Sequence, residues 1–394
     1  MSRITIDYTP AVQQSAGIGR LTREVTRALL ALPAPHAYTL LCMGRAAPPP
    51  LLLLTMRFVS TQLSDRWLHR IWFRARLPLP VEVLAGPADL YHATDFLLPP
   101  MFTRRTVLTV HDLTFERDPG SAAPTLLRFL QRVVPASARR ASHIVADSHA
   151  TARDLAELYG IDPQRVTVIH SGVDARFRPY ADAAEAAAES AALRAKYDLG
   201  TAPFVLTVGT LQRRKNHLGL VRAFARLASH NSNEKLNLVI SGGKGWLYDE
   251  VLAEVRALGL ADRVRFTGFA AEEDLPALYR AAAVFAFPSF YEGFGLPLLE
   301  AMASGVPVVS SNASSLPEVV GDAALTFDPR DDAALAAALL RTLDDAAWRT
   351  AAIERGLARA RAFTWERAAR QLVAVYESVL QSPPISRSRL HDVA

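Results

Sequence analysis

Short apolar runs alternate along the chain with longer stretches in which apolar residues recur at helical spacing. This alternation predicts parallel strands joined by helices, and it occurs in two series. The predicted strands of the first series are RITID (3–7), YTLLCM (38–43), DLYHA (89–93), TVLTV (106–110), HIVAD (143–147) and VTVIH (166–170). Those of the second series are FVLTVG (204–209), LNLVIS (236–241), VRFTG (264–268), VFAFP (284–288), PVVSS (307–311) and ALTFD (324–328).

The two series imply two domains. An Ala-rich, charged stretch near Tyr180 to Leu199 separates them, and 394 residues exceed what one hydrophobic core usually supports. We therefore expect an α/β protein with two Rossmann-like domains, at residues 1–182 and 195–362. The apolar residues of a last helical pattern, within 363–382, indicate a packed helix.

The stretch YEGFGLPLLE (291–300) follows the predicted strand VFAFP and opens a helix. Pro297 suits the first helical turn, where its missing N–H would have no partner, and Gly305 suits the helix end. Gly293 and Gly295 then lie in the connection between strand and helix. Free backbone N–H groups at a helix N-terminus attract anions, and glycines allow a phosphate to approach the backbone. The stretch therefore predicts an anion site.

Glu292 and Glu300 raise a chemical question at this site, because glycosidases use two carboxylates as an acid/base pair. Nothing in the pattern sets such a pair face to face, since Glu292 falls on the loop and Glu300 on the helix. A carboxylate would repel phosphate but accepts hydrogen bonds from hydroxyls. Two hydroxyl-binding carboxylates around an anion site fit a nucleoside diphosphate sugar. The alternative is that Glu300 merely stabilises the helix N-terminus.

A second motif, VGTLQRRKN, places basic residues after a strand and the turn at Gly209. Arg213, Arg214 and Lys215 would lie at the carboxyl end of a parallel strand, where ligands bind in open sheets. Such side chains can neutralise a diphosphate. The alternative is a solvated basic turn.

The N-terminal half offers further candidates. AGIGR brings Gly17 to the start of a helix but lacks the third glycine of the dinucleotide fingerprint. TVLTVHDLTF puts His111 and Asp112 at the carboxyl end of a strand, and a hydrogen-bonded structural histidine is the alternative there. RWLHRIWFRARLP (66–78) interleaves arginines with aromatic residues, which fits either a membrane-surface helix or an amphipathic helix with its aromatics in the core.

Composition narrows the class of protein. Lys+Arg 44 against Asp+Glu 39 gives a net charge of +5, a weak lean toward anionic partners. The basic residues do not form an aromatic-interleaved groove, so we expect no nucleic-acid partner. The single cysteine, Cys42, excludes an internal disulfide and a cysteine-based metal site, and no metal cluster is visible. The opening residues predict a strand and not a signal peptide, so we expect a cytoplasmic protein, at most peripheral to a membrane.

The block from Phe287 to Pro329 resembles the signature of the retaining glycosyltransferases of family four, which have the GT-B fold. AGIGRLTREV, TVHDLTF, VTVIHSGVD, VGTLQRRKN and VRFTGF also occur in the family's order, so the resemblance covers nearly the whole chain. It implies two Rossmann-like domains facing each other across a cleft. It also implies that the helix after Trp365 crosses back to the N-terminal domain.

The resemblance carries the family's roles onto matching positions. Glu300 would hold the ribose diol, Glu292 the donor hexose, and His111 the donor sugar near its anomeric centre. Arg214 and Lys215 would neutralise the diphosphate. Backbone groups expected to lie near the donor are those of Gly17, Gly209, Gly268, Phe269, Gly293, Phe294, Gly295 and Leu296. The implied co-substrate is a nucleotide sugar, with no metal or other cofactor.

Two departures from the family pattern refine this expectation. Many members have an arginine directly after the glycine of the basic motif, where this chain has Thr210, so the second cation must come from Arg214 or Arg213. In the first loop, Ala16-Gly17 replaces Gly-Gly and resembles the GIGR variant of mannosyltransferases that build polysaccharides. This favours transfer of mannose from GDP-mannose to a glycan or lipid-linked acceptor. UDP-glucose or another donor, a sugar-nucleotide epimerase, and a non-catalytic sugar-nucleotide-binding protein are the alternatives.

Overall fold

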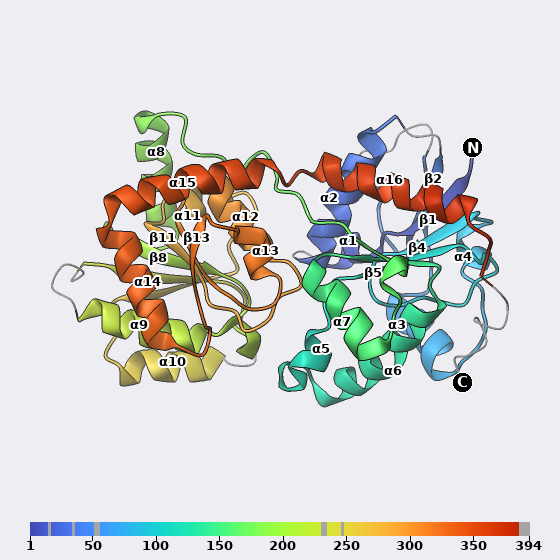
Figure 1. The fold of residues 1–394 in the computed structure, drawn as a ribbon, viewed down its shortest axis with the longest axis horizontal. Coiled ribbons are helices and arrows are strands. Elements are labelled where there is room, and N and C mark those ends of the chain that lie inside the picture. The colour runs from blue at the N-terminus through green and yellow to red at the C-terminus, as the bar shows by residue number, and fades with distance from the viewer. Residues whose placement is uncertain (15–16, 34–35, 51–55, 230–234, 246–247, 386–394) are drawn as a thin grey trace. The chain divides into compact units, whose positions relative to one another are not determined.

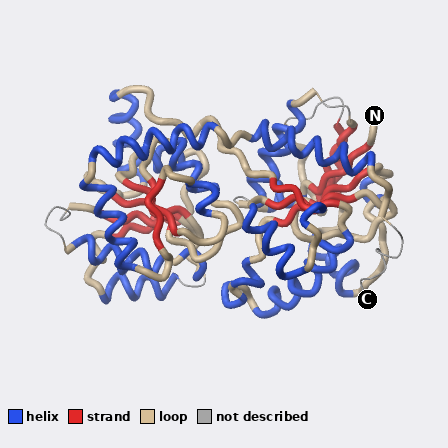
Figure 2. The backbone as a smooth tube through the Cα atoms, in the orientation of Figure 1, coloured by secondary structure: helices blue, strands red, loops and turns tan. Residues whose placement is uncertain are grey.

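The computed structural model describes residues 1–394 except 15–16, 34–35, 51–55, 230–234, 246–247 and 386–394. The chain forms two compact units, Met1–Gly172 with Thr364–Ala394, and Val173–Phe363 (Figure 1). Figure 2 shows the strands of each unit between helices. Strands enclosed in this way have two buried faces, which explains their continuous apolar runs.

The first unit contains a seven-stranded parallel sheet in the order β3-β2-β1-β4-β5-β6-β7. Its strands are β1 (Arg3–Asp7), β2 (Ala37–Cys42), β3 (Met56–Ser60), β4 (Leu90–Ala93), β5 (Thr106–Val110), β6 (His143–Ala146) and β7 (Val166–Val168). Its helices are α1 (Thr9–Gln13), α2 (Ile18–Ala31), α3 (Asp65–His69), the π-helix η1 (Arg70–Arg74), α4 (Glu82–Ala85), α5 (Thr114–Arg117), η2 (Pro119–Ser121), α6 (Pro124–Arg140), α7 (His149–Tyr159), η3 (Pro163–Arg165) and α16 (Trp365–Gln381).

The second unit contains a six-stranded parallel sheet in the order β10-β9-β8-β11-β12-β13. Its strands are β8 (Phe204–Val208), β9 (Asn237–Ser241), β10 (Val264–Gly268), β11 (Val284–Phe287), β12 (Val308–Ser311) and β13 (Ala324–Phe327). Its helices are α8 (Ala183–Lys196), η4 (Arg213–Lys215), α9 (His217–Ala228), α10 (Tyr248–Ala257), α11 (Leu275–Arg280), α12 (Leu296–Ala303), α13 (Leu316–Val320), α14 (Asp332–Asp344) and α15 (Ala346–Arg361).

The two-domain α/β prediction is confirmed, and all twelve predicted strands lie where the patterns placed them, within a residue or two at their ends. One strand was missed. β3 lies at the edge of the first sheet, is partly exposed and contains Arg57, so its apolar signal is weak.

The chain crosses between units at Gly172–Val173 and at Phe363–Thr364. The first crossing precedes the predicted boundary at residue 182, and α8 belongs to the second unit because Leu193 is buried in a core with Phe204. The last helix, α16, returns to the first unit. There Ala369, Leu372 and Tyr376 are buried in the same core as Ile4 of β1. That return of the chain confirms the expected position of the C-terminal helix.

Candidate active site

The anion site predicted at the start of α12 is built from a strand end, a tight loop and a helix N-terminus. β11 ends at Phe287, and Gly295 with φ +112° caps α12 at its N-terminus. A Cβ on Gly295 would lie 2.9 Å from Leu316 Cδ2, so both the backbone angle and the packing require glycine. Pro297 occupies the first turn, as expected. A helix N-terminus favours an anion in general. Here the N–H of Leu298 donates to the carbonyl oxygen of Gly295 at 3.0 Å, and anion binding at this end of α12 stays a prediction.

Serine hydroxyls fix the loop that contains Glu292. The backbone N–H of Glu292 donates to Ser314 Oγ at 2.9 Å. Ser315 Oγ lies 2.9 Å from the carbonyl oxygens of both Glu292 and Phe294. All these groups are buried or partly buried, so the hydrogen bonds hold the loop in a single conformation.

Two of the three predicted basic residues contact Glu292, whereas Arg213 is exposed. Arg214 Nη1 lies 2.6 Å from Glu292 Oε2, and Lys215 Nζ lies 2.6 Å from Glu292 Oε1. Lys215 Nζ also lies 4.9 Å from the centre of the Phe287 ring. The structure thus brings together the cations of one motif and the first carboxylate of the other, and the basic turn is not simply a solvated one.

The environment of Glu292 decides its protonation state. Burial would raise the pKa of its carboxyl, but Arg214 and Lys215, with hydrogen bonds, lower it to about 2. Glu292 is therefore ionised near neutral pH and has no proton to donate. Because a glycosidase pair requires one protonated carboxyl, this carboxylate is better suited to accept hydrogen bonds than to act as a general acid.

Glu300 lies within α12 and has a different partner. Glu300 is 3% exposed, and Tyr279 Oη of α11 donates a hydrogen bond to its Oε2 at 2.8 Å. A buried carboxylate with a fixed hydrogen-bond donor is held in one orientation. Such a carboxylate can serve as a rigid hydroxyl acceptor.

His111 lies in the first unit, at the end of β5, and its residue is 4% exposed. Its Nδ1 lies 2.8 Å from Asp147 Oδ2, and its Nε2 lies 2.8 Å from the carbonyl oxygen of Thr94. Burial lowers the pKa of His111, but the charge and hydrogen bond of Asp147, with Asp95 and Thr94, raise it to about 9. Both ring nitrogens of His111 therefore have hydrogen-bond partners within the first unit, as expected for a structural histidine.

The remaining predicted donor residues are mostly backbone positions. Gly17 has φ +56° and precedes α2, but its neighbour Ala16 lies outside the described residues. Lys215 lies against Gly209. A Cβ on this glycine would be 3.3 Å from Lys215 Cε. Gly268 has φ +68°, and the side chain of Phe269 after it is 59% exposed, so its ring is open to a planar ligand.

Sequence reasoning missed several residues that support the site. Asp147 was only part of a predicted strand, although its position at a strand end on the same sheet edge as His111 could have indicated a pair. Ser314 and Ser315 carried no signal, because they follow β12 and the fold brings their hydroxyls to the loop of Glu292. Tyr279 carried no signal, because its partner Glu300 is distant in sequence.

The Arg66 to Pro78 stretch divides its aromatic residues between core and surface. Trp72 is buried and donates from Nε1 to the Leu79 carbonyl oxygen at 2.8 Å. Trp67 is 56% exposed, with the Arg70 guanidinium carbon 4.9 Å from its ring centre. The core alternative therefore applies to Trp72, and membrane contact by the exposed part of the segment stays a prediction.

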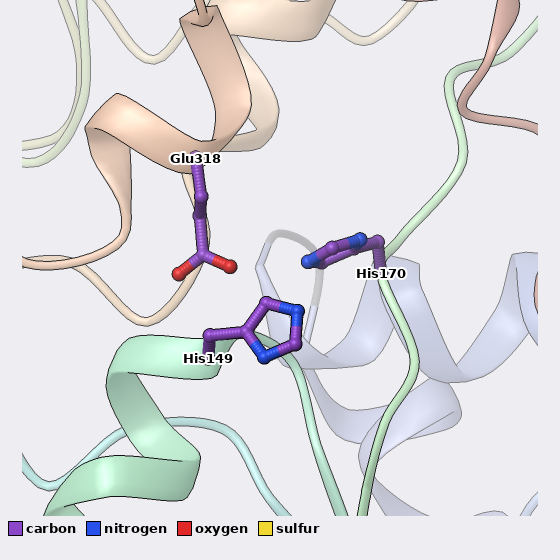
Figure 3. A group of neighbouring side chains, drawn as sticks. All are labelled: His149, His170 and Glu318. Carbon is purple, nitrogen blue, oxygen red and sulfur yellow. The ribbon is translucent and has the colours of Figure 1, made fainter.

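Two neighbouring histidine side chains, one of them at the start of α7, raise the question of a metal site. His149 and His170 of the first unit have ring centroids 5.7 Å apart (Figure 3). The third side chain drawn there, Glu318, is a residue of α13 in the second unit. A histidine pair supplies two ligands where zinc sites use at least three protein ligands, so the pair by itself does not make such a site.

Comparison with solved structures defines the fold. Sucrose-phosphate synthase from Thermosynechococcus elongatus matches with a TM-score of 0.74 and 23% identity, covering 96% of this chain and 99% of that one. The glycosyltransferase WaaG matches with a TM-score of 0.70 and 16% identity over 95% of this chain and 99% of that one. These likenesses show the GT-B fold.

Sequence comparison then gives the family. The family model for group 1 glycosyl transferases matches residues 189–359, and that for glycosyltransferase family 4 matches residues 15–177. O-antigen chain mannosyltransferase B of Escherichia coli is 37% identical over 289 residues, covering 73% of this chain and 74% of that protein. The chain belongs to glycosyltransferase family 4, as the sequence motifs indicated.

A second relative, D-inositol 3-phosphate glycosyltransferase of Salinispora tropica, is 40% identical over 266 residues. That alignment covers 64% of this chain and 54% of the relative, so the chain spans about half of that protein. Among the described residues, no helix combines the length and apolar character needed to cross a membrane.

Proposed function

We propose that this glycosyltransferase moves mannose from GDP-mannose to a glycan or lipid-linked acceptor with retention of the anomeric configuration. The observation that carries the proposal is the cluster at the start of α12. A helix N-terminus, two cations from η4 and two oriented carboxylates surround one loop there. An anion flanked by hydroxyl groups on both sides is the ligand that such a set complements.

Each part of the cluster has a role in this proposal. Glu300 accepts hydrogen bonds from the ribose diol, and Glu292 accepts them from the hexose. Arg214 and Lys215 exchange part of their contact with Glu292 for contact with the diphosphate. In this proposal the two cationic side chains favour the anionic donor.

The proposed reaction needs no protein nucleophile. The bond from the anomeric carbon to the diphosphate oxygen breaks while the acceptor oxygen bonds to the same face of that carbon. The acceptor proton passes to the departing phosphate oxygen. Negative charge grows on the diphosphate, and in this proposal Arg214, Lys215 and the N-terminus of α12 stabilise it.

Mannose is the preferred sugar on two grounds. The first loop carries the GIGR form, and the Escherichia coli relative that covers most of this chain is a mannosyltransferase by name. UDP-glucose as donor, epimerisation of the sugar nucleotide, and binding without turnover are the outcomes that an experiment must separate.

The test is product analysis. The full chain is incubated with GDP-mannose or UDP-glucose and a panel of glycan and lipid-linked acceptors, and the anomeric configuration of the product is determined by NMR. We expect an α-mannoside from GDP-mannose, and loss of transfer with a retained fold in Lys215→Ala and Glu292→Ala. Unchanged turnover in either variant, a β-linked product or an epimerised nucleotide sugar would refute the assignment.

A membrane surface is the second partner in the proposal, with the enzyme in the cytoplasm and peripheral to the inner membrane face. Residues 66–78 contain four arginines and no acidic residue. The exposed residues of this segment are Arg66, Trp67, Arg70, Arg74, Ala75, Arg76, Leu77 and Pro78. Exposed arginines beside an exposed tryptophan complement the headgroups and interface of an anionic bilayer, at about 1 kcal/mol per basic residue.

Vesicle sedimentation tests this contact. Vesicles rich in phosphatidylglycerol are expected to bind the full chain and to lose most of that binding in the double variant Trp67→Ser/Arg70→Ser. A matched pair in the second unit, Arg256→Ser/Leu258→Ser, also removes an exposed arginine and an exposed apolar residue and should leave binding unchanged. Equal binding to neutral phosphatidylcholine vesicles, or equal loss in both variants, would exclude the proposed surface.

A further inference from the structure

Asn216 lies between the turn that carries the two cations and the helix that follows it. It comes directly after η4 and is the N-cap residue of α9, with φ +53° and ψ +40°. This left-handed conformation is costly for most side chains, and glycine, asparagine and aspartate tolerate it best. The chain therefore changes direction at Asn216, and a residue that resists this conformation would displace η4.

The side chain of Asn216 uses both ends of its amide. The residue is 8% exposed. Its Nδ2 donates to the carbonyl oxygen of Pro329, after β13, at 2.7 Å, and its Oδ1 accepts from the backbone N–H of Gly219 in α9 at 3.2 Å. A glycine side chain offers neither group, and an ionised aspartate offers no donor. Among the residues that best tolerate the left-handed conformation, only asparagine can make both bonds.

The surroundings of Asn216 leave its side chain little room to move. A Cβ on Gly219 would lie 2.6 Å from Asn216 Oδ1 and 2.7 Å from Asp332 Oδ1, at the start of α14. The first turn of α9 therefore approaches these side chains more closely than any residue other than glycine would allow. Asn216 is thus held by α9 on one side and by the segment after β13 on the other.

The turn η4 is also attached to the loop that contains Glu292. The backbone N–H of Phe290 donates to the carbonyl oxygen of Arg214 at 2.7 Å. Arg214 and Lys215 contact the two oxygens of Glu292, each at 2.6 Å. In a 3₁₀ turn successive side chains point about 120° apart, so two neighbouring residues reach one carboxylate only when the turn is held in a particular position. Phe290 and Asn216 hold that turn from two sides.

We propose that Asn216 is a positioning residue for the diphosphate site, because its left-handed backbone and two side-chain hydrogen bonds keep Arg214 and Lys215 directed at the loop of Glu292. The diphosphate comes from the proposed function, on which this part of the inference rests, whereas the effect on the contacts with Glu292 needs no ligand. The alternative is that Asn216 only caps α9. A cap alone would contribute to stability and leave the two cations and the donor unaffected.

A double-mutant cycle tests the positioning without any ligand. Urea unfolding of the full chain is measured for the natural chain, Asn216→Gly, Glu292→Gln and the double variant. Glycine keeps the left-handed backbone and removes both side-chain bonds, so this variant should fold. The factor by which Glu292→Gln raises the unfolding equilibrium constant should fall roughly tenfold in the Asn216→Gly background, because the cations no longer hold the carboxylate. An equal factor in both backgrounds overturns the proposal.

Asp345 provides the matched control for this cycle. It caps α15 in the same unit, where its side chain accepts from the backbone N–H of Trp348 at 2.9 Å. Asp345→Gly removes a cap as Asn216→Gly does, and it should leave the effect of Glu292→Gln unchanged. If both backgrounds reduce that effect equally, the loss of any cap suffices and the positioning role is refuted.

Two nucleotides test the effect on the diphosphate. GDP and GMP differ by one phosphate, so the ratio of their Kd values in calorimetric titration measures what the second phosphate adds. We expect this ratio to fall roughly tenfold in Asn216→Gly and further in Asn216→Ala, whose Cβ opposes the left-handed backbone, and to stay unchanged in Asp345→Gly. An unchanged ratio in both Asn216 variants contradicts the role at the donor. A natural chain that binds neither nucleotide refutes the proposed function instead, and the unfolding cycle then decides on Asn216.

Discussion

The two glutamates of the loop and helix have separate environments, and this separation defines the site at the scale of single residues. Glu292 is held by two cations, and Glu300 is held by a tyrosine hydroxyl. The sequence placed them on a loop and a helix, and the structure adds the partners that orient them. Those partners could not be predicted, because Tyr279 and the two cations are brought to the carboxylates by the fold and not by nearby sequence.

Glu300→Gln should weaken donor binding without unfolding the protein. The amide has nearly the same shape, but a hydrogen bond to a carboxylate is stronger than one to an amide by about 1 to 2 kcal/mol, or roughly tenfold in Kd. Calorimetric titration with GDP-mannose measures the change. Glu250→Gln, an exposed glutamate on α10, is the matched control and should bind as the natural chain does. Equal affinities for the two variants would remove Glu300 from the donor site.

The ion pairs of Glu292 should make stability depend on pH. The pKa of Glu292 is lowered from 4.5 to about 2 in the folded chain, so its charge adds to the free energy of unfolding above about pH 4.5. That contribution is lost as the pH falls toward 2. Urea unfolding between pH about 7 and about 3 measures the free energy of unfolding of the natural chain and of Glu292→Gln. The difference between the two should shrink as the pH falls. A difference that stays constant or grows in acid would contradict the ion pairs.

At the scale of elements, the glycines between β11 and α12 set the direction of the helix that opens the site. The sequence predicted both ends of this helix, because proline favours a first turn and glycine a helix end. Pro297 lies in the first turn, and Gly305 follows the helix with φ +74°. Less could be predicted where a signal depends on packing. β3 is a weak edge strand, and α8 looked like a linker because few of its residues are buried.

Gly295→Ala should disturb both stability and donor binding. The alanine would have to adopt φ +112° with its Cβ 2.9 Å from the fully buried Leu316, which we expect to cost about 1 to 3 kcal/mol. Gly243→Ala is the matched control, since nothing lies within 4 Å of its Cβ position. Chemical denaturation of both variants measures the cost. A Gly295→Ala protein as stable as Gly243→Ala would show that the loop does not need the left-handed conformation.

At the scale of the whole molecule, the two series of strands predicted two α/β units, and family membership agrees with them. The crossing points could not be predicted closely. Gly172 lies before an Ala-rich stretch whose helix, α8, contributes Leu193 to the second core, and composition does not show which core receives it. The same limit applies to His111, whose motif was evident but whose raised pKa depends on Asp147, which follows another strand.

The proposed function requires that the second unit binds a nucleoside diphosphate sugar at the start of α12. Calorimetric titration of the full chain with GDP-mannose tests it most directly, because it requires no acceptor. We predict one donor per chain, with binding lost in Lys215→Ala, weakened in Glu300→Gln and unchanged in Glu250→Gln. Binding of equal strength in all three variants, or no binding of GDP-mannose and UDP-glucose by the natural chain, would contradict the account.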